Sequence, residues 1–186
     1  MSRKLVSTVV FVAALAGAAW LGHRLRDAQE ARTKLAQAQS LLAAPIEIAP
    51  ALEDLRVTEA RGLLVEAQAL APAQTTAALI ELTRAIEHWQ HARTTEAAAA
   101  LGRARELAPR LPLLQLAAAT AALRAGDRAG AHRELTQLLA RTGSEPRALL
   151  LASDLAREEG LADQALTFVM RALSQHPKAS VLHLRL

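Results

Sequence analysis

The chain has 186 residues, enough for one core-bearing unit. Hydrophobic residues make up 52% of it and aromatic residues only 2%, which favours Ala- and Leu-rich helices and argues against a β-sandwich. The net charge is only +4, and the arginines are scattered along the chain among Glu and Asp residues. We therefore expect solvated helix faces and no nucleic-acid partner. Cysteine is absent, which excludes disulfides and thiolate metal sites.

The first element in chain order is an uncharged, strongly apolar stretch at residues 5–22, preceded by a short basic tail. A membrane-spanning helix needs about 20 apolar residues, with a lower limit near 17, so residues 1–22 are predicted to form a transmembrane anchor in contact with the lipid bilayer. Trp20 suits the aromatic belt at the far boundary. An uncleaved or cleaved signal peptide is the alternative, because small-x-small triplets occur between residues 14 and 18.

Small residues in this stretch follow a small-xxx-small spacing that permits close contact with another membrane helix. They are Ala13, Ala14, Gly17 and Ala18. The competing interpretation is that Ala and Gly are simply common in membrane spans. Retention of the short basic tail in the cytoplasm predicts a single-pass protein of a bacterial inner membrane with its repeat domain in the periplasm. Counting Lys and Arg on both sides slightly favours the opposite orientation, so the cytoplasmic side stays open.

Residues 23–75 are predicted to form a juxtamembrane helix and a degenerate half-repeat. The first part is rich in good helix formers, so the anchor helix is expected to continue into it. Pro50 suits the first position of a second helix, which should stop before Pro72. A helix N-cap is then expected at Thr75 or Thr76.

Further along the chain, a sequence repeat of about 34 residues occurs twice in register, which is typical of stacked supersecondary units. The matched pairs are Pro112 and Pro146, Ala118 and Ala152, Ala119 and Ser153, Ala122 and Ala156, Gly126 and Gly160, and Ala131 and Ala165. The two glycines are predicted to end helices, because glycine adopts the left-handed C′ conformation at no steric cost. The small residues let paired helices approach closely, so each copy should be a helical hairpin that stacks on its neighbour.

This pattern resembles the tetratricopeptide repeat (TPR). In the last copy the family's characteristic positions are occupied by Leu149, Ala152, Ser153, Ala156, Ala165, Val169, Ala172 and Pro177. In the copy before it the matches are Ala118, Ala119, Ala122, Ala131, Leu135 and Leu138. One more step back matches Ala85, Ala97, Leu101, Ala104 and Pro109, although Glu81, Arg84 and His88 occupy sites where apolar residues are expected.

The resemblance implies an all-α fold, with a short α-solenoid of TPR-like hairpins after the N-terminal transmembrane helix that the apolar stretch predicts. The repeat region would span residues 76–186. Its units would be residues 78–111, 112–145 and 146–178, with the start of a further helix at 179–186.

In TPR proteins the first helices of successive repeats line a groove. The resemblance therefore implies a partner-binding groove lined by Leu79, Leu82, Ile86, Trp89, Leu113, Leu116, Thr120, Leu123, Arg147, Leu150, Asp154 and Arg157. Such a mostly apolar lining suits an amphipathic helix, with Trp89 as a binding anchor. The equal alternative is that residues 24–71 fold back and bury these side chains.

The sequence offers few candidates for a metal-binding or catalytic site. His88 and His91 are three residues apart, but zinc needs three or four ligands and no motif supplies the others, so we expect no metal and no cofactor. No nucleophile elbow, phosphate-binding glycine loop or zinc-protease motif occurs, and we expect no enzyme.

The function predicted from the sequence is that of a non-catalytic, membrane-anchored TPR scaffold or assembly factor in a bacterial envelope complex. Its partner would be a protein helix or a membrane complex. The alternatives are a structural accessory subunit of a larger membrane complex and a secreted periplasmic TPR binding module.

Overall fold

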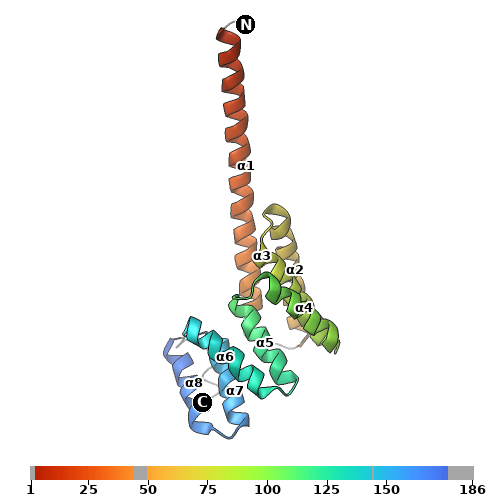
Figure 1. The fold of residues 1–186 in the computed structure, drawn as a ribbon, viewed down its shortest axis with the longest axis vertical. Coiled ribbons are helices and arrows are strands. Elements are labelled where there is room, and N and C mark those ends of the chain that lie inside the picture. The colour runs from red at the N-terminus through yellow and green to blue at the C-terminus, as the bar shows by residue number, and fades with distance from the viewer. Residues whose placement is uncertain (1–2, 44–49, 144, 176–186) are drawn as a thin grey trace.

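The computed structural model of the chain describes residues 3–43, 50–143 and 145–175. Side chains are described from residue 20 onward, except at 43 and 50–54. The described residues form eight α-helices and no strand (Figure 1): α1 (Arg3–Ala43), α2 (Pro50–Leu70), α3 (Gln74–Gln90), α4 (Thr94–Leu107), α5 (Pro112–Arg124), α6 (Arg128–Thr142), α7 (Pro146–Glu158) and α8 (Ala162–Gln175). The predicted further helix at 179–186 lies outside the described residues.

Helix α1 is a single unbroken rod of 41 residues, as the helix-forming composition predicted. At 1.5 Å per residue it is about 60 Å long. Its N-terminal part projects away from the other helices, and its C-terminal part packs along α2 (Figure 1).

The backbone of the predicted membrane anchor belongs to α1, but the structure does not describe most of its side chains. In the described part of the chain, no helix is both long enough and apolar enough to cross a bilayer. The side chains of residues 5–19, with the small-residue strip Ala13, Ala14, Gly17 and Ala18, lie outside that part.

Helices α1 and α2 form a hairpin held by small buried residues and by charge. Ala38 of α1 and Ala60 of α2 are both fully buried in the same apolar cluster. Lys34 Nζ donates to Glu66 Oε2 at 2.6 Å across the two helices. This hydrogen bond raises the pKa of Lys34, because it stabilises the protonated ammonium group.

Three further hairpins follow, α3–α4, α5–α6 and α7–α8, and their boundaries follow from local sequence. Proline occupies the first turn of α5 and of α7, where its missing N–H costs nothing. Asp127 and Glu145 cap α6 and α7 through bonds to the N–H groups of Gly130 and Ala148, at 2.8 and 2.6 Å. The predicted cap of α3 is wrong, because α3 begins after Ala73, which makes no side-chain cap bond.

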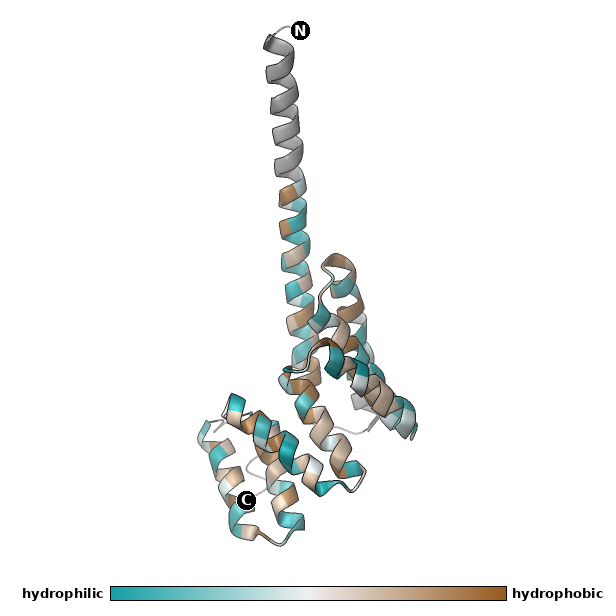
Figure 2. Cartoon of the chain, in the orientation of Figure 1, coloured by the Kyte–Doolittle hydropathy of each residue, from teal (hydrophilic) through white to brown (hydrophobic). Residues whose placement is uncertain are grey.

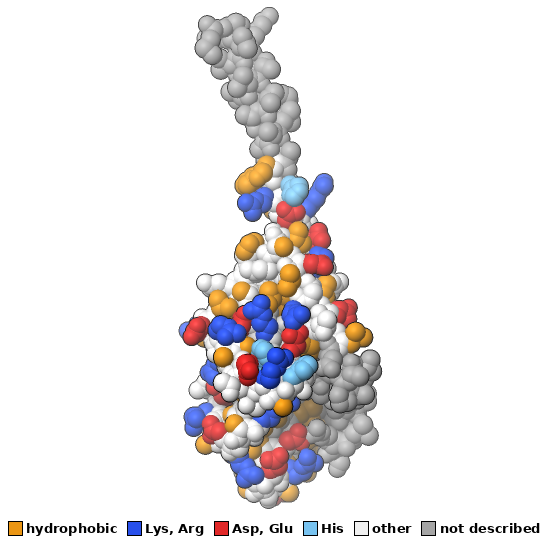
Figure 3. All heavy atoms as spheres, turned by 90° about the vertical axis from the view of Figure 1, so that its right-hand side faces the viewer, with side chains coloured by type: hydrophobic (Ala, Val, Ile, Leu, Met, Phe, Trp, Pro, Cys, Tyr) orange, Lys and Arg blue, Asp and Glu red, His pale blue; other side chains and the backbone are white. Residues whose placement is uncertain are grey.

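The apolar core is divided into two main clusters that share α5. Leu114 and Ala118 belong to the first cluster, with residues of α1 to α4. Leu116 and Ala119 lie in the second cluster, with residues of α6 and α7. Charged side chains lie outside these clusters, and on the face that Figure 3 presents, basic and acidic groups are interspersed. Brown and teal residues accordingly alternate along the helices in Figure 2.

Candidate functional site: an apolar groove with arginine ends

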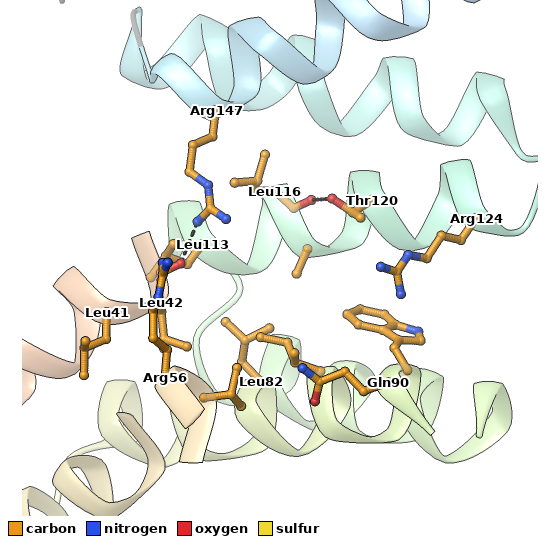
Figure 4. A pocket seen from close by; sticks show the side chains of 14 residues that line it. Leu41, Leu42, Arg56, Leu82, Gln90, Leu113, Leu116, Thr120, Arg124 and Arg147 are labelled. Carbon is orange, nitrogen blue, oxygen red and sulfur yellow. Dashed lines mark hydrogen bonds between the residues drawn. The ribbon is translucent and has the colours of Figure 1, made fainter. Parts of the chain in front are cut away.

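The candidate site is a cavity of about 240 Å³ between the end of α1 and helices α2, α3 and α5, with the start of α7 above it (Figure 4). We call it the groove cavity. Its lining residues are Leu41, Leu42, Arg56, Val57, Leu82, Ile86, Trp89, Gln90, Leu113, Leu116, Ala117, Thr120, Arg124 and Arg147.

Two parallel rows of side chains make its walls. On α3, Leu82, Ile86 and Trp89 follow a spacing of four and three residues, which places them on one helix face. On α5, Leu116 and Thr120 lie 34 positions after Leu82 and Ile86, so the repeat period places them beside one another. Leu82 is buried in the first core cluster and Ile86, Trp89 and Leu113 pack against it, so the wall is apolar along most of its length.

The polar groups of the lining are mainly guanidinium groups. The lining residues include three arginines and, among those the structure describes, no acidic residue. Arg124 lies over the ring of Trp89, with its guanidinium carbon 5.7 Å from the ring centre, in a cation–π arrangement. Arg147 Nη1 donates to the backbone carbonyl of Leu42 at 2.6 Å, which joins α7 to the end of α1.

The structure brings part of the predicted groove together. Seven predicted residues line the cavity: Leu82, Ile86, Trp89, Leu113, Leu116, Thr120 and Arg147. Leu79 is fully buried in the first core cluster, and Leu123 and Leu150 pack against the other apolar clusters. Asp154 and Arg157 form an ion pair of 3.3 Å away from the cavity.

Sequence reasoning did not assign the remaining wall. Leu41, Leu42, Arg56 and Val57 come from the α1–α2 hairpin, and Gln90, Ala117 and Arg124 complete the lining. One signal was available: Arg56, Gln90 and Arg124 are spaced by the same 34 residues as the repeat. The α1–α2 hairpin thus covers one side of the groove and leaves a cavity in its middle.

The described residues hold no group of three or more His, Asp or Glu side chains placed to bind a metal ion. His91 Nδ1 lies 2.8 Å from the carbonyl oxygen of Glu87, one turn earlier, which is a local helix-end contact. His132 instead pairs with Glu159 at 2.9 Å, between α6 and the end of α7.

Comparison with known protein families and with curated proteins gives no match. Comparison with solved structures gives a thermophilic TPR protein of Thermus thermophilus, with a TM-score of 0.53. The similarity covers 72% of this chain and 73% of that chain at 22% sequence identity. The fold is that of a TPR protein. The resemblance of the 34-residue repeat to the TPR is confirmed at the level of the fold. The groove cavity lies between α3 and α5, the first helices of two successive hairpins.

Proposed function

We propose that this TPR protein is a non-catalytic, membrane-anchored scaffold or assembly factor that holds a partner protein in its groove in a bacterial envelope complex. The groove cavity is the observation that carries this proposal. It is an apolar hollow among α2, α3 and α5, and stacked helical repeats use such concave surfaces for binding.

The anchor is supported by the sequence of residues 5–22 and by the described side chains next to it. Trp20 and Leu21 are 60% and 56% exposed, although both are large and apolar. Arg24 lies over the ring of Trp20 at 5.2 Å, and a Trp–Arg pair suits the headgroup region of a bilayer. A membrane covering these side chains would remove the cost of exposing them to water.

Because α1 is unbroken, it would fix the distance between the membrane anchor and the groove cavity. The same helix includes Trp20 and ends beside the groove cavity with Leu41 and Leu42. Trp20 and Leu41 are 21 positions apart, which corresponds to about 30 Å along the helix. A partner in the groove would therefore be held at a fixed height above the bilayer, and its effective concentration there would rise without new contacts.

Cross-linking in living cells tests the scaffold role. A photoreactive amino acid at Thr120, inside the groove cavity, should yield one discrete adduct in the membrane fraction. The same amino acid at Arg133, an exposed site on α6 outside the cavity, is the matched control and should yield none. Equal adducts from both sites, or none from Thr120, would count against a groove-bound partner.

Membrane attachment has its own test. The chain should remain in the membrane pellet after alkaline carbonate extraction, and Phe11→Asp together with Leu15→Asp should release it, because charged groups in a span cost about 3 kcal/mol each. The protein has no cysteine, so Arg133→Cys gives a single label site. Labelling of that thiol by an impermeant maleimide in intact cells would place the repeats in the periplasm; protection until the inner membrane is broken would place them in the cytoplasm.

A further inference from the structure

We propose that a second copy of this chain packs against the free side of α1, so that two α1 helices pair in parallel between the membrane and the repeats. This inference rests on the membrane anchor of the proposed function and adds a partner to it. Three observations carry it: two exposed leucines on α1, the spacing of the residues around them, and the charged residues at the same height.

The exposed leucines are Leu21 and Leu25, one helical turn apart. Their exposed fractions are 56% and 61%. They belong to the part of α1 that projects away from the other helices in Figure 1. Large apolar side chains that stay in water forgo the free energy that burial would release, so a surface that covers both leucines would stabilise the protein.

The spacing around these leucines is that of a helix–helix contact. Leu21, Leu25 and Ala28 are separated by steps of four and three residues, and the sequence continues these steps into the anchor through Ala18 and Ala14. Alternating steps of three and four place residues along the seam of two helices that wrap around each other. We call Ala14, Ala18, Leu21, Leu25 and Ala28 the outer stripe.

The outer stripe lies on a different side of α1 from the contact with α2. Ala31 and Ala38 are buried on the side that packs along α2. Since successive residues of a helix are turned by about 100°, the outer stripe is turned away from these alanines by about a quarter of a circle. Farther along the same side, Arg32 and Ala36 are exposed, so the repeats leave this side of α1 free.

The charged residues at this height favour a protein over lipid as the cover for Leu25. Leu25 is five positions beyond Trp20, or about 7.5 Å along the helix. Arg24 and Arg26 flank it, and His23 Nδ1 lies 2.8 Å from Asp27 Oδ2 beside it. Charged side chains are costly in the hydrocarbon layer, so this part of α1 belongs above that layer, where acyl chains do not cover Leu25.

A second copy fits this stripe because of its orientation. Copies anchored through the same helix lie parallel in one membrane and at one height, so each leucine would meet its own equivalent across a two-fold axis. In a parallel pair, the residue before a stripe position faces the residue five positions later on the partner helix. Arg24 would therefore face Gln29 of the second copy, and no like charges would oppose each other there.

Arg32 would end the contact. It is the next position of the same spacing, and two guanidinium groups would meet there and repel each other. The paired region would therefore stop where α2 packs along α1, as the bond from Lys34 to Glu66 shows. The two sets of repeats would lie side by side, and the two groove cavities could bind a partner with two sites more tightly than either cavity alone.

Disulfide cross-linking in membranes tests this pairing, because the chain contains no cysteine of its own. Single cysteines are introduced into the 186-residue chain at six sites, all exposed or half-buried, so the variants should fold. The outer-stripe variants are Leu21→Cys, Leu25→Cys and Ala28→Cys. The matched controls on the other sides of the same turns are His23→Cys, Arg26→Cys and Glu30→Cys.

After mild oxidation, the outer-stripe variants should give a disulfide-linked species of twice the chain mass on a non-reducing gel. They should give at least about fivefold more of it than the controls, because a disulfide forms only between Cα atoms less than about 7 Å apart. Labelling all six variants with a maleimide under denaturing conditions shows that equal amounts of thiol are present.

The outcomes separate this inference from the proposed function. Equal dimer at all six sites would mean random collision and would overturn the pairing. The absence of dimer from a chain that stays in the carbonate-extracted pellet would overturn the pairing and leave the anchor. A cross-linked species of any other mass would place a different protein on the outer stripe. Release of the parent chain from the pellet would overturn both the anchor and the parallel pairing.

Discussion

Gly126 and Gly160 show how single residues set the period of the solenoid. They follow α5 and α7 with φ of 76° and 78°, in the left-handed region that glycine adopts without strain. The residue after each donates back to the helix, as in Asp127 N to Ala122 O at 2.8 Å, which is the Schellman closure. The equivalent site after α3 is occupied by Ala92, with φ of 57° and the same closure from Arg93 N to His88 O at 2.8 Å.

This difference predicts opposite effects at equivalent sites. Ala92→Gly should stabilise the protein by about 1 kcal/mol, because it relieves the left-handed strain of a residue with a Cβ. Gly126→Ala should destabilise it by about 1–2 kcal/mol, although its added Cβ would meet no atom within 4 Å. Urea denaturation of both variants measures the two changes. Equal signs would mean that the backbone conformation does not govern these sites.

The polar residues at apolar TPR positions of α3 also have a residue-level explanation. Glu81 is only 12% exposed at its side chain, and it pairs with both Arg84 and Arg103. Arg103 lies on α4, so the carboxylate joins the two helices of the hairpin as an apolar contact would. A sequence pattern scores such a residue as a mismatch, because the partner that satisfies it lies 22 positions away.

At the scale of elements, α2 behaves as the second helix of one more repeat. Ala60, Leu64 and Ala67 are buried and repeat the small-large-small order of Ala97, Leu101 and Ala104 in α4, also buried. The offset is 37 residues instead of 34, so the match fails when the period is applied strictly. The sequence predicted a half-repeat here, and in the structure the C-terminal part of α1 packs along α2.

Leu64 therefore should be needed for the α1–α2 hairpin. It is fully buried in the first core cluster, and Leu64→Ala should cost about 2–5 kcal/mol through lost contacts and a residual cavity. Val65, the next residue, is 53% exposed, so Val65→Ala should change the stability by no more than about 0.5 kcal/mol. Thermal and urea unfolding of the pair compares a buried with an exposed truncation on the same turn. Similar losses in both would mean that α2 does not pack as described.

At the scale of the whole molecule, the sequence predicted the hairpins that repeat and left open whether residues 24–71 fold back over the groove. The hairpins from α3 to α8 could be predicted from the 34-residue period and from the proline and glycine residues that mark helix starts and ends. The proline and glycine signals each depend on only a few neighbouring residues. The covering of the groove by Leu41, Leu42, Arg56 and Val57 depends on how α1 and α2 fold back. The bond from Arg147 to the Leu42 carbonyl joins residues 105 positions apart, and no local pattern encodes it.

The same architecture predicts that stability is divided along the chain. Among the described helices, only α5 contributes to both main core clusters, and in a stacked-repeat protein each unit is stabilised mainly by its own packing and by contacts with its neighbours. Leu138 of α6 is fully buried in the second cluster, so Leu138→Ala should lower the protection of α6, α7 and α8 against amide hydrogen exchange. Protection of α3 and α4 should stay at the level of the parent protein, because their packing lies in the first cluster.

Leu101→Ala provides the matched comparison, because Leu101 is a buried leucine of the second helix in the preceding hairpin. It should reverse the pattern, with faster exchange in α3 and α4 and a smaller change in α7 and α8. Hydrogen exchange read out by mass spectrometry resolves these helices as separate peptides. A uniform loss of protection in both variants would mean that the chain unfolds as one cooperative unit. The groove cavity lies against α5, the helix common to both clusters, so partner binding there should raise the protection of both halves together.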